Sequence, residues 1–263
     1  MPGLNEVLAK KSRGEKIVML TAYDYSLAVL LEKAGVDIIL VGDSLANVVL
    51  GLEATSQVGM AVMLHHTQAV LRGVKSAPVV ADMPFDAYQP EGSDALKNAE
   101  AFMAAGCAAV KVEWFGRCLE VVAVLVKAGV PVIGHVGLTP QTVEQLGGFK
   151  VQGRTDVAAE AIREQSRKLE QAGCVAVVLE CVPEGLARQI TAELHIPVIG
   201  IGAGKYCDGQ VLVVNDMLGL YDRKTPKFVK KYADIGAEVV EAVKCYKKEV
   251  EEGVFPGPQQ TFL

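Results

Sequence analysis

Eight short runs of apolar, largely β-branched residues recur along the 263-residue chain, and they constrain its fold more than any other feature. Such near-continuous apolar runs are typical of strands in a parallel sheet, because helices cover both faces of that kind of sheet. We therefore expect strands at residues 16–22, 36–42, 77–83, 108–114, 130–136, 174–180, 196–202 and 210–216.

The segments between most of these runs have the spacing of amphipathic helices. In "DYSLAVLLEKAG", Leu27, Leu30 and Leu31 repeat at helical intervals, and Gly35 is a typical helix stop. Eight strands with intervening helices predict a (β/α)8 TIM barrel forming a single domain over residues 1–263, with an N-terminal helix and an extended C-terminal tail. An open doubly wound sheet is the alternative, and it is disfavoured because no change in loop character marks a mid-chain crevice.

Two parts of the chain depart from a regular β/α repeat. The segment "IGAGKYCDG" is too short for a full crossover helix between the last two strands. Near the C-terminus, one apolar stripe predicts a helix that packs on the barrel. Its members are Phe228, Tyr232, Ile235, Val239 and Val243.

Composition excludes several classes of function. A net charge of −5 and a pI near 5.5 argue against a surface for nucleic acid or anionic membranes. No apolar run approaches the roughly 18 residues of a membrane helix, and the charged N-terminus lacks the apolar core of a signal peptide. Six cysteines without C-x-x-C spacing indicate reduced thiols. We expect a cytoplasmic protein with neither nucleic-acid nor membrane partners.

Polar residues stand where the predicted strands end. In (β/α)8 barrels, the carboxyl ends of the strands and the loops after them build the active site. Lys111 and Glu113 alternate with Val110 and Val112, which places both charges on the lumen face. The full set consists of Asp43, Ser44, Asp82, Lys111, Glu113, His135 and Glu180.

Carboxylates dominate this set, and carboxylates packed together repel each other unless a cation or protons neutralise them. Aspartate and glutamate without thiolate or histidine-rich ligands favour a hard ion, Mg²⁺ first. Such an ion can bind the two adjacent oxygens of a 2-oxo acid and stabilise an enolate. Glu180, on a separate strand, is a candidate base for the carbon acid proton.

Each of these residues also has a plainer interpretation. A single aspartate after a strand is more often a helix cap than a ligand. Lys111 and Glu113 could form a structural ion pair, His135 could be a satisfied core histidine, and Glu180 could cap the next helix. The coincidence of all of them at successive strand ends favours a site.

A set of motifs along the whole chain resembles the ketopantoate hydroxymethyltransferase family. The motifs are "MLTAYDY", "ILVGDSL", "LHHT", "ADMPF", "VKVE", "GHVGLTPQ", "GGFKVQGR", "VLECVP", "IPVIGIGAG" and "DGQVLVVNDMLG". The resemblance implies a TIM barrel of the phosphoenolpyruvate/pyruvate type. It implies transfer of a one-carbon unit from 5,10-methylenetetrahydrofolate to 3-methyl-2-oxobutanoate, which gives 2-dehydropantoate for pantothenate and coenzyme A synthesis. It also implies Mg²⁺ and a homodecamer.

The resemblance also assigns roles to the residues at the strand ends. It makes Asp43, Asp82 and Glu113 the metal ligands, the last of them directly or through a water, and Glu180 the proton acceptor. It makes Ser44 and Lys111 the groups that hold the substrate carboxylate, and His135 a hydrogen-bonding residue beside them. Asp43 and Asp82 then contact the substrate as well. The long segment 137–154 is interpreted as a lid, with Lys150, Arg154 or Lys205 as candidates to meet the folate glutamate.

Two other functions stay open on the residues alone. An isocitrate-lyase-like enzyme that breaks a carbon–carbon bond is disfavoured, because a "K-x-C-G-H" type loop is absent. A barrel that only binds a 2-oxo acid is disfavoured because binding alone does not need a base at Glu180.

Overall fold

The computed structural model of the chain describes residues 2–221 and 225–262. Its eight strands are all parallel and pair in sequence order, and the last pairs with the first to close a barrel. This confirms the predicted (β/α)8 architecture and excludes the open sheet. The strands are β1 Ile17–Thr21, β2 Ile38–Val41, β3 Val79–Asp82, β4 Ala109–Glu113, β5 Val132–Gly137, β6 Ala176–Glu180, β7 Val198–Ile201 and β8 Gly209–Leu212.

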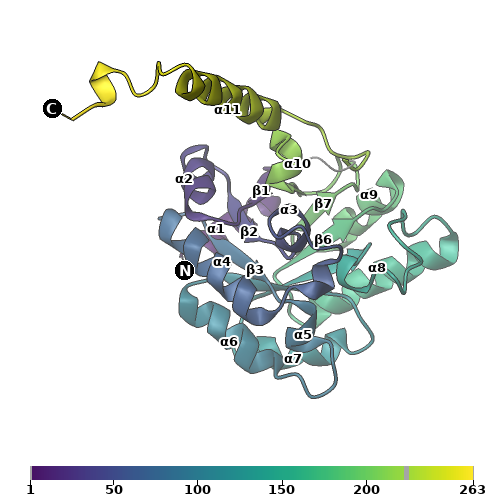
Figure 1. Ribbon diagram of the computed structural model, residues 1–263. Coiled ribbons are helices and arrows are strands. Elements are labelled where there is room, and N and C mark those ends of the chain that lie inside the picture. Colours follow the sequence, from purple (N-terminus) through teal and green to yellow (C-terminus); the bar gives the residue numbers. More distant parts are fainter. Residues whose placement is uncertain (1, 222–224, 263) are drawn as a thin grey trace. The chain divides into compact units, whose positions relative to one another are not determined.

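Helices surround the strands, as Figure 1 shows for α4, α6 and α7 below the barrel and α8 and α9 beside it. The helices of this unit are α1 Pro2–Leu8, α2 Tyr25–Lys33, α3 Leu45–Val48, α4 Met60–Gly73, α5 Phe85–Tyr88, α6 Ala95–Ala105, α7 Cys118–Lys127, α8 Asp156–Gln171 and α9 Glu184–Glu193. Short 3₁₀ turns stand at η1 Lys11–Arg13, η2 Thr55–Gln57 and η3 Pro140–Thr142. No helix separates β7 from β8, in agreement with the short connection in the sequence.

Local signals fix the ends of these helices. The Asp24 side chain accepts a hydrogen bond from the Leu27 backbone N–H and so begins α2. Thr155 begins α8 in the same way. Gly35 and Gly173 follow the two helices with φ of 75° and 97°, conformations that glycine adopts without steric cost. The chain can therefore turn directly into the next buried strand.

Apolar side chains fill the lumen of the barrel over most of its height. Every second residue of a strand points inward, so Met19, Ile133 and Val178 meet in the lumen although they belong to different strands. Leu4 of α1 joins the same cluster, and Val7 and Leu8 pack against it. The amino-terminal end of the barrel is therefore closed by the first helix.

The chain divides into two compact units, Met1–Val213 with the barrel and Val214–Leu263. The second contains α10 Val214–Leu218, α11 Ile235–Glu251 and the 3₁₀ turn η4 Pro258–Gln260. Because α11 begins at Ile235, the prediction that Phe228 and Tyr232 lie on this helix is wrong. No residue of α11 is buried. Its packing on the barrel, and a single domain over residues 1–263, stay predictions.

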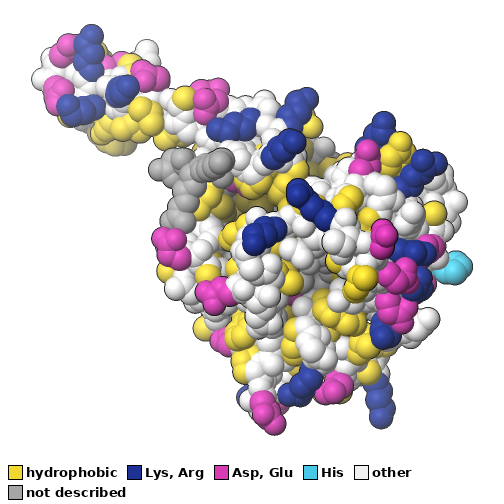
Figure 2. Space-filling view, turned by 90° about the vertical axis from the view of Figure 1, so that its right-hand side faces the viewer, with side chains coloured by type: hydrophobic (Ala, Val, Ile, Leu, Met, Phe, Trp, Pro, Cys, Tyr) yellow, Lys and Arg dark blue, Asp and Glu magenta, His cyan; other side chains and the backbone are white. Residues whose placement is uncertain are grey.

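Charges of both signs are present on the face shown in Figure 2, and they interleave most closely at its right-hand edge. Within residues 2–221 and 225–262, no helix has the length and apolar character needed to cross a membrane.

Candidate active site at the carboxyl ends of the strands

The register of the sheet makes charged residues of adjacent strands neighbours in pairs. Asp82 of β3 is the neighbour of Lys111 on β4, and Glu113 of β4 is the neighbour of His135 on β5. One strand further, Gly137 is the neighbour of Glu180 on β6. The residues that sequence reasoning placed at separate strand ends therefore lie side by side at the mouth of the lumen.

Lys111 forms a buried ion pair with Asp82. Its Nζ lies 3.0 Å from Asp82 Oδ1, and both side chains are at most 5% exposed. Burial raises the pKa of Asp82 to about 6, although the Lys111 charge opposes the shift. Burial would lower the pKa of Lys111, but attraction by Asp82, Glu113 and Asp43 raises it above its ordinary value. The partner of Lys111 is thus Asp82 on the next strand, and no ion pair joins Lys111 to Glu113 in the described chain.

His135 lies between two carboxylates. Its Nδ1 is 3.4 Å from Glu113 Oε1, and its Nε2 is 3.2 Å from Glu180 Oε2. Burial and the nearby Lys111 charge lower the pKa of His135, but Glu113 and Glu180 outweigh both and raise it to about 9. The imidazole therefore connects a carboxylate of β4 with that of β6, and Lys111 Nζ lies 3.3 Å from its Nδ1.

Asp43 and Ser44 occupy the turn after β2. The backbone N–H of Asp43 donates to Asp82 Oδ2 over 2.9 Å, which joins two of the predicted ligands directly. Burial and then the Glu113 charge raise the pKa of Asp43. The Ser44 hydroxyl lies 2.8 Å from the hydroxyl of Tyr23, a buried residue that the strand-end analysis did not single out.

Helix capping explains none of the three carboxylates at the ends of β2, β3 and β6. The helix after β2 has Ser44 at its N-cap without a side-chain hydrogen bond, and the helix after β6 has Pro183 there. The side chains of Asp43 and Asp82 instead accept hydrogen bonds within the cluster. The plainer interpretation of these residues as caps is therefore wrong.

Gln141 is a central residue that the strand-end analysis missed. It lies in η3, just after β5, and is 5% exposed. Its Nε2 donates to Asp43 Oδ2 over 2.8 Å, and its backbone N–H donates to Glu113 Oε2 over 3.0 Å. The signal available in the sequence was a polar residue in the "GLTPQ" turn directly after a strand.

Glu180 differs from the other carboxylates in its surroundings. Its side chain is 14% exposed, whereas those of Asp82 and Glu113 are at most 3% exposed. The next residue, Cys181, has a φ of 49° and is the single non-glycine residue with positive φ in the described part of the chain. Strained backbone of this kind clusters at functional sites.

Two backbone hydrogen bonds attach the long β5–α8 segment to this strand end. The N–H of Leu138 donates to the Glu180 carbonyl, and that of Gln152 donates to the Cys181 carbonyl. Gly137 permits the first bond, because it has a φ of 93° and a Cβ there would overlap the Glu180 carbonyl oxygen. Phe149, at 74% exposure, projects from the segment into solvent.

The donor set fits a magnesium ion by its chemistry. Asp43, Asp82 and Glu113 provide carboxylate oxygens, which are the ligands that Mg²⁺ prefers. Glu113 Oε1 is buried and accepts no hydrogen bond of good geometry, so it remains available for a cation. Asp82 Oδ1 is paired with Lys111 Nζ over 3.0 Å, so a cation bound there would compete with this ion pair. Among the described residues, no three side chains already converge as a finished ligand set. Binding would therefore require small movements of these carboxylates.

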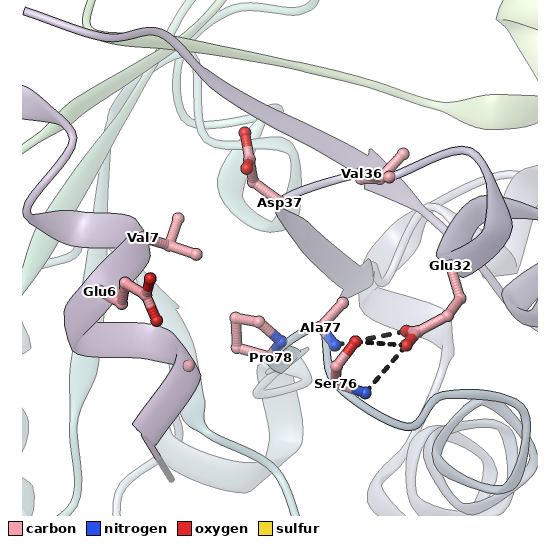
Figure 3. Close-up of a pocket in the computed structure, with 10 residues that line it drawn as sticks. Glu6, Val7, Glu32, Val36, Asp37, Ser76, Ala77 and Pro78 are labelled. Atoms are coloured by element: carbon pink, nitrogen blue, oxygen red, sulfur yellow. Dashed lines mark hydrogen bonds between the residues drawn. The ribbon is translucent and has the colours of Figure 1, made fainter.

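The opposite end of the barrel has a surface hollow of different character. Figure 3 shows it between α1 and the segments that lead into β2 and β3. Two of its three acidic groups already have partners: Glu32 accepts hydrogen bonds from Ser76 and Ala77, and Asp37 pairs with Lys10. The carboxyl-end cluster is therefore the better candidate for chemistry.

The fold and this cluster define the class of protein: a (β/α)8 barrel with an acidic site at the carboxyl ends of its strands. Solved structures show the same fold. A phosphonopyruvate hydrolase in complex with oxalate and Mg⁺⁺ matches with a TM-score of 0.63 at 14% identity, covering 96% of this chain and 90% of that one. A 2,3-dimethylmalate lyase of the PEP mutase/isocitrate lyase superfamily matches with a TM-score of 0.61 at 18% identity, covering 96% and 92%.

The chain belongs to the ketopantoate hydroxymethyltransferase family, whose model matches residues 3–258. A 3-methyl-2-oxobutanoate hydroxymethyltransferase of Syntrophus aciditrophicus is 56% identical over 96% of this chain and 93% of its own length. One from Heliobacterium modesticaldum is 53% identical over 96% and 92%. The resemblance noted in the motifs is confirmed.

Proposed function

We propose that this chain is a 3-methyl-2-oxobutanoate hydroxymethyltransferase. It would transfer a one-carbon unit from 5,10-methylenetetrahydrofolate to 3-methyl-2-oxobutanoate and form 2-dehydropantoate for pantothenate synthesis. Relatives named for this activity match the chain over 93% and 92% of their own length. The structural observation that carries the proposal is Glu180, a partly open carboxylate 3.2 Å from a buried histidine and on a different strand from the acidic cluster.

In this proposal the substrate carboxylate binds at Lys111 and Ser44. Lys111 keeps its charge because three carboxylates surround it, and it would attract the substrate carboxylate once a bound cation offsets those three charges. The Ser44 hydroxyl is held by Tyr23, which orients it at the mouth of the barrel. Asp43, Asp82 and Glu113 would hold Mg²⁺, which when bound supplies a Lewis acid for the negative charge that develops on the keto oxygen.

Glu180 then takes the proton from C3 of the oxo acid. His135, whose Nε2 lies 3.2 Å from Glu180 Oε2, holds the carboxylate in place for the transfer. The electron pair left on C3 forms the new bond to the methylene carbon of the folate iminium, in which one carbon–nitrogen bond is already open, and the C=N electron pair moves onto the remaining nitrogen. Water then replaces that nitrogen on the same carbon: its hydroxyl stays on the product, and its proton and the one taken by Glu180 end on the two folate nitrogens. One water enters per turnover, because the product carries a hydroxyl where the folate had a carbon–nitrogen bond.

The proposal has three finer features, of which only the oligomeric state comes from the resemblance to the family. They are a homodecamer, a cytoplasmic location and closure of segment 137–154 over the bound substrates. Exclusion of water during proton transfer is the physical reason for such a lid. The exposure of Phe149 supports the lid, since this segment projects an apolar side chain that closure would cover.

Exchange of the C3 proton tests the chemical step without the folate. NMR should show Mg²⁺-dependent deuterium exchange into 3-methyl-2-oxobutanoate, and a chelator should stop it. Glu180→Gln should slow exchange by about 10²–10⁴-fold, the usual contribution of a positioned base. Glu100→Gln, on the exposed surface of α6, is the matched control. Undiminished exchange in Glu180→Gln would overturn the assignment of the base. Folate-dependent product formation then distinguishes the transferase from a lyase or a binding protein.

A further inference from the structure

The side chain of Gln141 is fully engaged at the acidic cluster. Its Nε2 donates to Asp43 Oδ2 over 2.8 Å and to the Met83 carbonyl over 2.9 Å. Its Oε1 accepts from the Tyr88 hydroxyl and from Gln89 Nε2, each over 2.8 Å. A buried carboxamide with four partners has one fixed position.

These partners also determine which way the carboxamide faces. If the amide were turned over, its oxygen would meet the Asp43 carboxylate and the Met83 carbonyl, which are both acceptors. Its nitrogen would then meet Gln89 Nε2, a donor. Tyr88 is held in turn, because its hydroxyl accepts from the Glu113 backbone N–H over 2.9 Å and its ring packs edge-on against Phe115. The donor side of Gln141 is therefore locked toward Asp43.

The consequence is that one residue directs two carboxylates from different strands. Gln141 occupies one oxygen of Asp43 through its side chain and one oxygen of Glu113 through its backbone. The Asp43 backbone N–H occupies one oxygen of Asp82 in the same manner. Each of the three carboxylates thus has one oxygen that accepts a hydrogen bond from an N–H group, of the Gln141 side chain or of the backbone, and a second oxygen that does not contact that group.

We propose that Gln141, locked by Tyr88 and Gln89, is a positioning residue that presents Asp43 and Glu113 as single-oxygen ligands to a divalent cation. The inference rests on the proposed function in that it takes these carboxylates as the metal site. It adds a residue that touches neither the metal nor the substrate. Partners of metal ligands commonly change metal affinity by 10–100-fold when they are replaced.

Binding of Mn²⁺ alone, followed by electron paramagnetic resonance, tests the inference without reference to catalysis. Gln141→Met keeps the length of the side chain and removes both polar ends, so Mn²⁺ affinity should fall about 10–100-fold. Tyr88→Phe should also weaken binding, because the Tyr88 hydroxyl bonds both Gln141 Oε1 and the Glu113 backbone N–H. Gln89→Met should weaken it by less, because both of those bonds remain. Gln68→Met, on the exposed face of α4, should bind Mn²⁺ like the wild type.

A double-mutant cycle separates positioning from general loss of packing. If Tyr88 acts through Gln141, Tyr88→Phe combined with Gln141→Met should weaken Mn²⁺ binding by less than the product of the two single effects. Thermal unfolding without metal shows which variants are folded at the temperature of the titration. Gln89→Met provides the test should the larger changes prevent folding.

The outcomes distinguish this inference from the metal site itself. If the wild type binds Mn²⁺ tightly and folded Gln141→Met binds it equally well, the role of Gln141 is overturned and the metal site is not. Gln89→Met takes the place of Gln141→Met in this comparison if the latter does not fold. A wild type that binds no Mn²⁺ would overturn the metal site, and the positioning role with it. Weakened binding with the expected non-additivity supports the inference.

Discussion

The two ends of the same barrel lumen differ sharply in chemistry. Ile133 and Val178 belong to an apolar cluster that fills the lower lumen. His135 and Glu180 lie two residues further along the same strands, a distance of about 7 Å along each strand. Both levels are buried, since His135 is 2% exposed. Burial alone therefore does not distinguish the core from the site.

The difference lies in what each side chain needs from its neighbours. The apolar level requires shape complementarity only, and one hydrophobic residue can substitute for another of similar volume at modest cost. At the charged level, removal of one group leaves another uncompensated, as with Lys111 and Asp82. Four changes at the two levels test this contrast.

Loss of Lys111 should have the largest effect on stability. Lys111→Met leaves Asp82 as a buried charge without a partner and should lower the free energy of unfolding by about 3–5 kcal/mol at pH 8. Urea unfolding measures this. At pH 5, below the Asp82 pKa of about 6, the loss should be smaller because the acid is neutral. Lys111→Met combined with Asp82→Asn should recover most of it. An equal loss at both pH values would contradict the ion pair.

Truncation in the apolar level should damage stability and leave the chemistry intact. Ile133→Ala creates a cavity and should lower the free energy of unfolding by about 2–5 kcal/mol. Proton exchange at C3, measured per folded molecule, should stay within about threefold of the wild type. A decrease as large as that expected for Glu180→Gln would show that the two levels are not independent.

The charged level should also make the stability of the metal-free protein fall with rising pH. Asp82 and His135 both have folded pKa values above their unfolded ones, about 6 and about 9. The folded state then binds more protons, so stability decreases as pH rises through each window, from about 4 to 6 and from about 6.5 to 9. Each group contributes at most about 1.4 kcal/mol per pH unit. Urea unfolding across pH should show His135→Gln losing the upper window, whereas Ile133→Ala keeps it.

The smallest expected effect concerns the strained residue beside Glu180. Cys181→Gly removes the steric cost of a positive φ and should raise the free energy of unfolding by about 1 kcal/mol. Cys174, buried just before the same strand at the apolar end, has no such strain. Cys174→Gly should therefore lower stability. The same sign for both variants in urea unfolding would rule out strain at position 181.

Much of this arrangement could be predicted from the sequence because it follows from two short-range regularities. Alternation along a strand places Lys111 and Glu113 in the lumen, and the register of the adjacent strands makes Asp82 the neighbour of Lys111 and His135 the neighbour of Glu113. Both rules need only the local pattern and the register of parallel strands. The C-terminal helix shows their limit: Phe228 and Tyr232 continue its apolar spacing, yet the helix begins at Ile235.

What the sequence could not reveal are contacts between loops that are distant in the chain. Gln141 is 98 residues from Asp43, and Tyr88 is 53 residues from Gln141. No periodicity links such positions, because their proximity depends on the closed barrel. The partner of Lys111 was missed for a related reason: Asp82 lies on the next strand, and Glu113 lies on the same one.

Gly137 has a consequence for how such a chain can evolve. Its backbone approaches the Glu180 carbonyl so closely that no other amino acid fits, and the hydrogen bond from Leu138 depends on that approach. Selection should therefore remove substitutions at position 137 as strictly as substitutions of the proposed base. A residue with no side chain would then be as restricted as a glutamate 43 positions away, the glycine by the space beside a backbone carbonyl and the glutamate by its proposed chemistry.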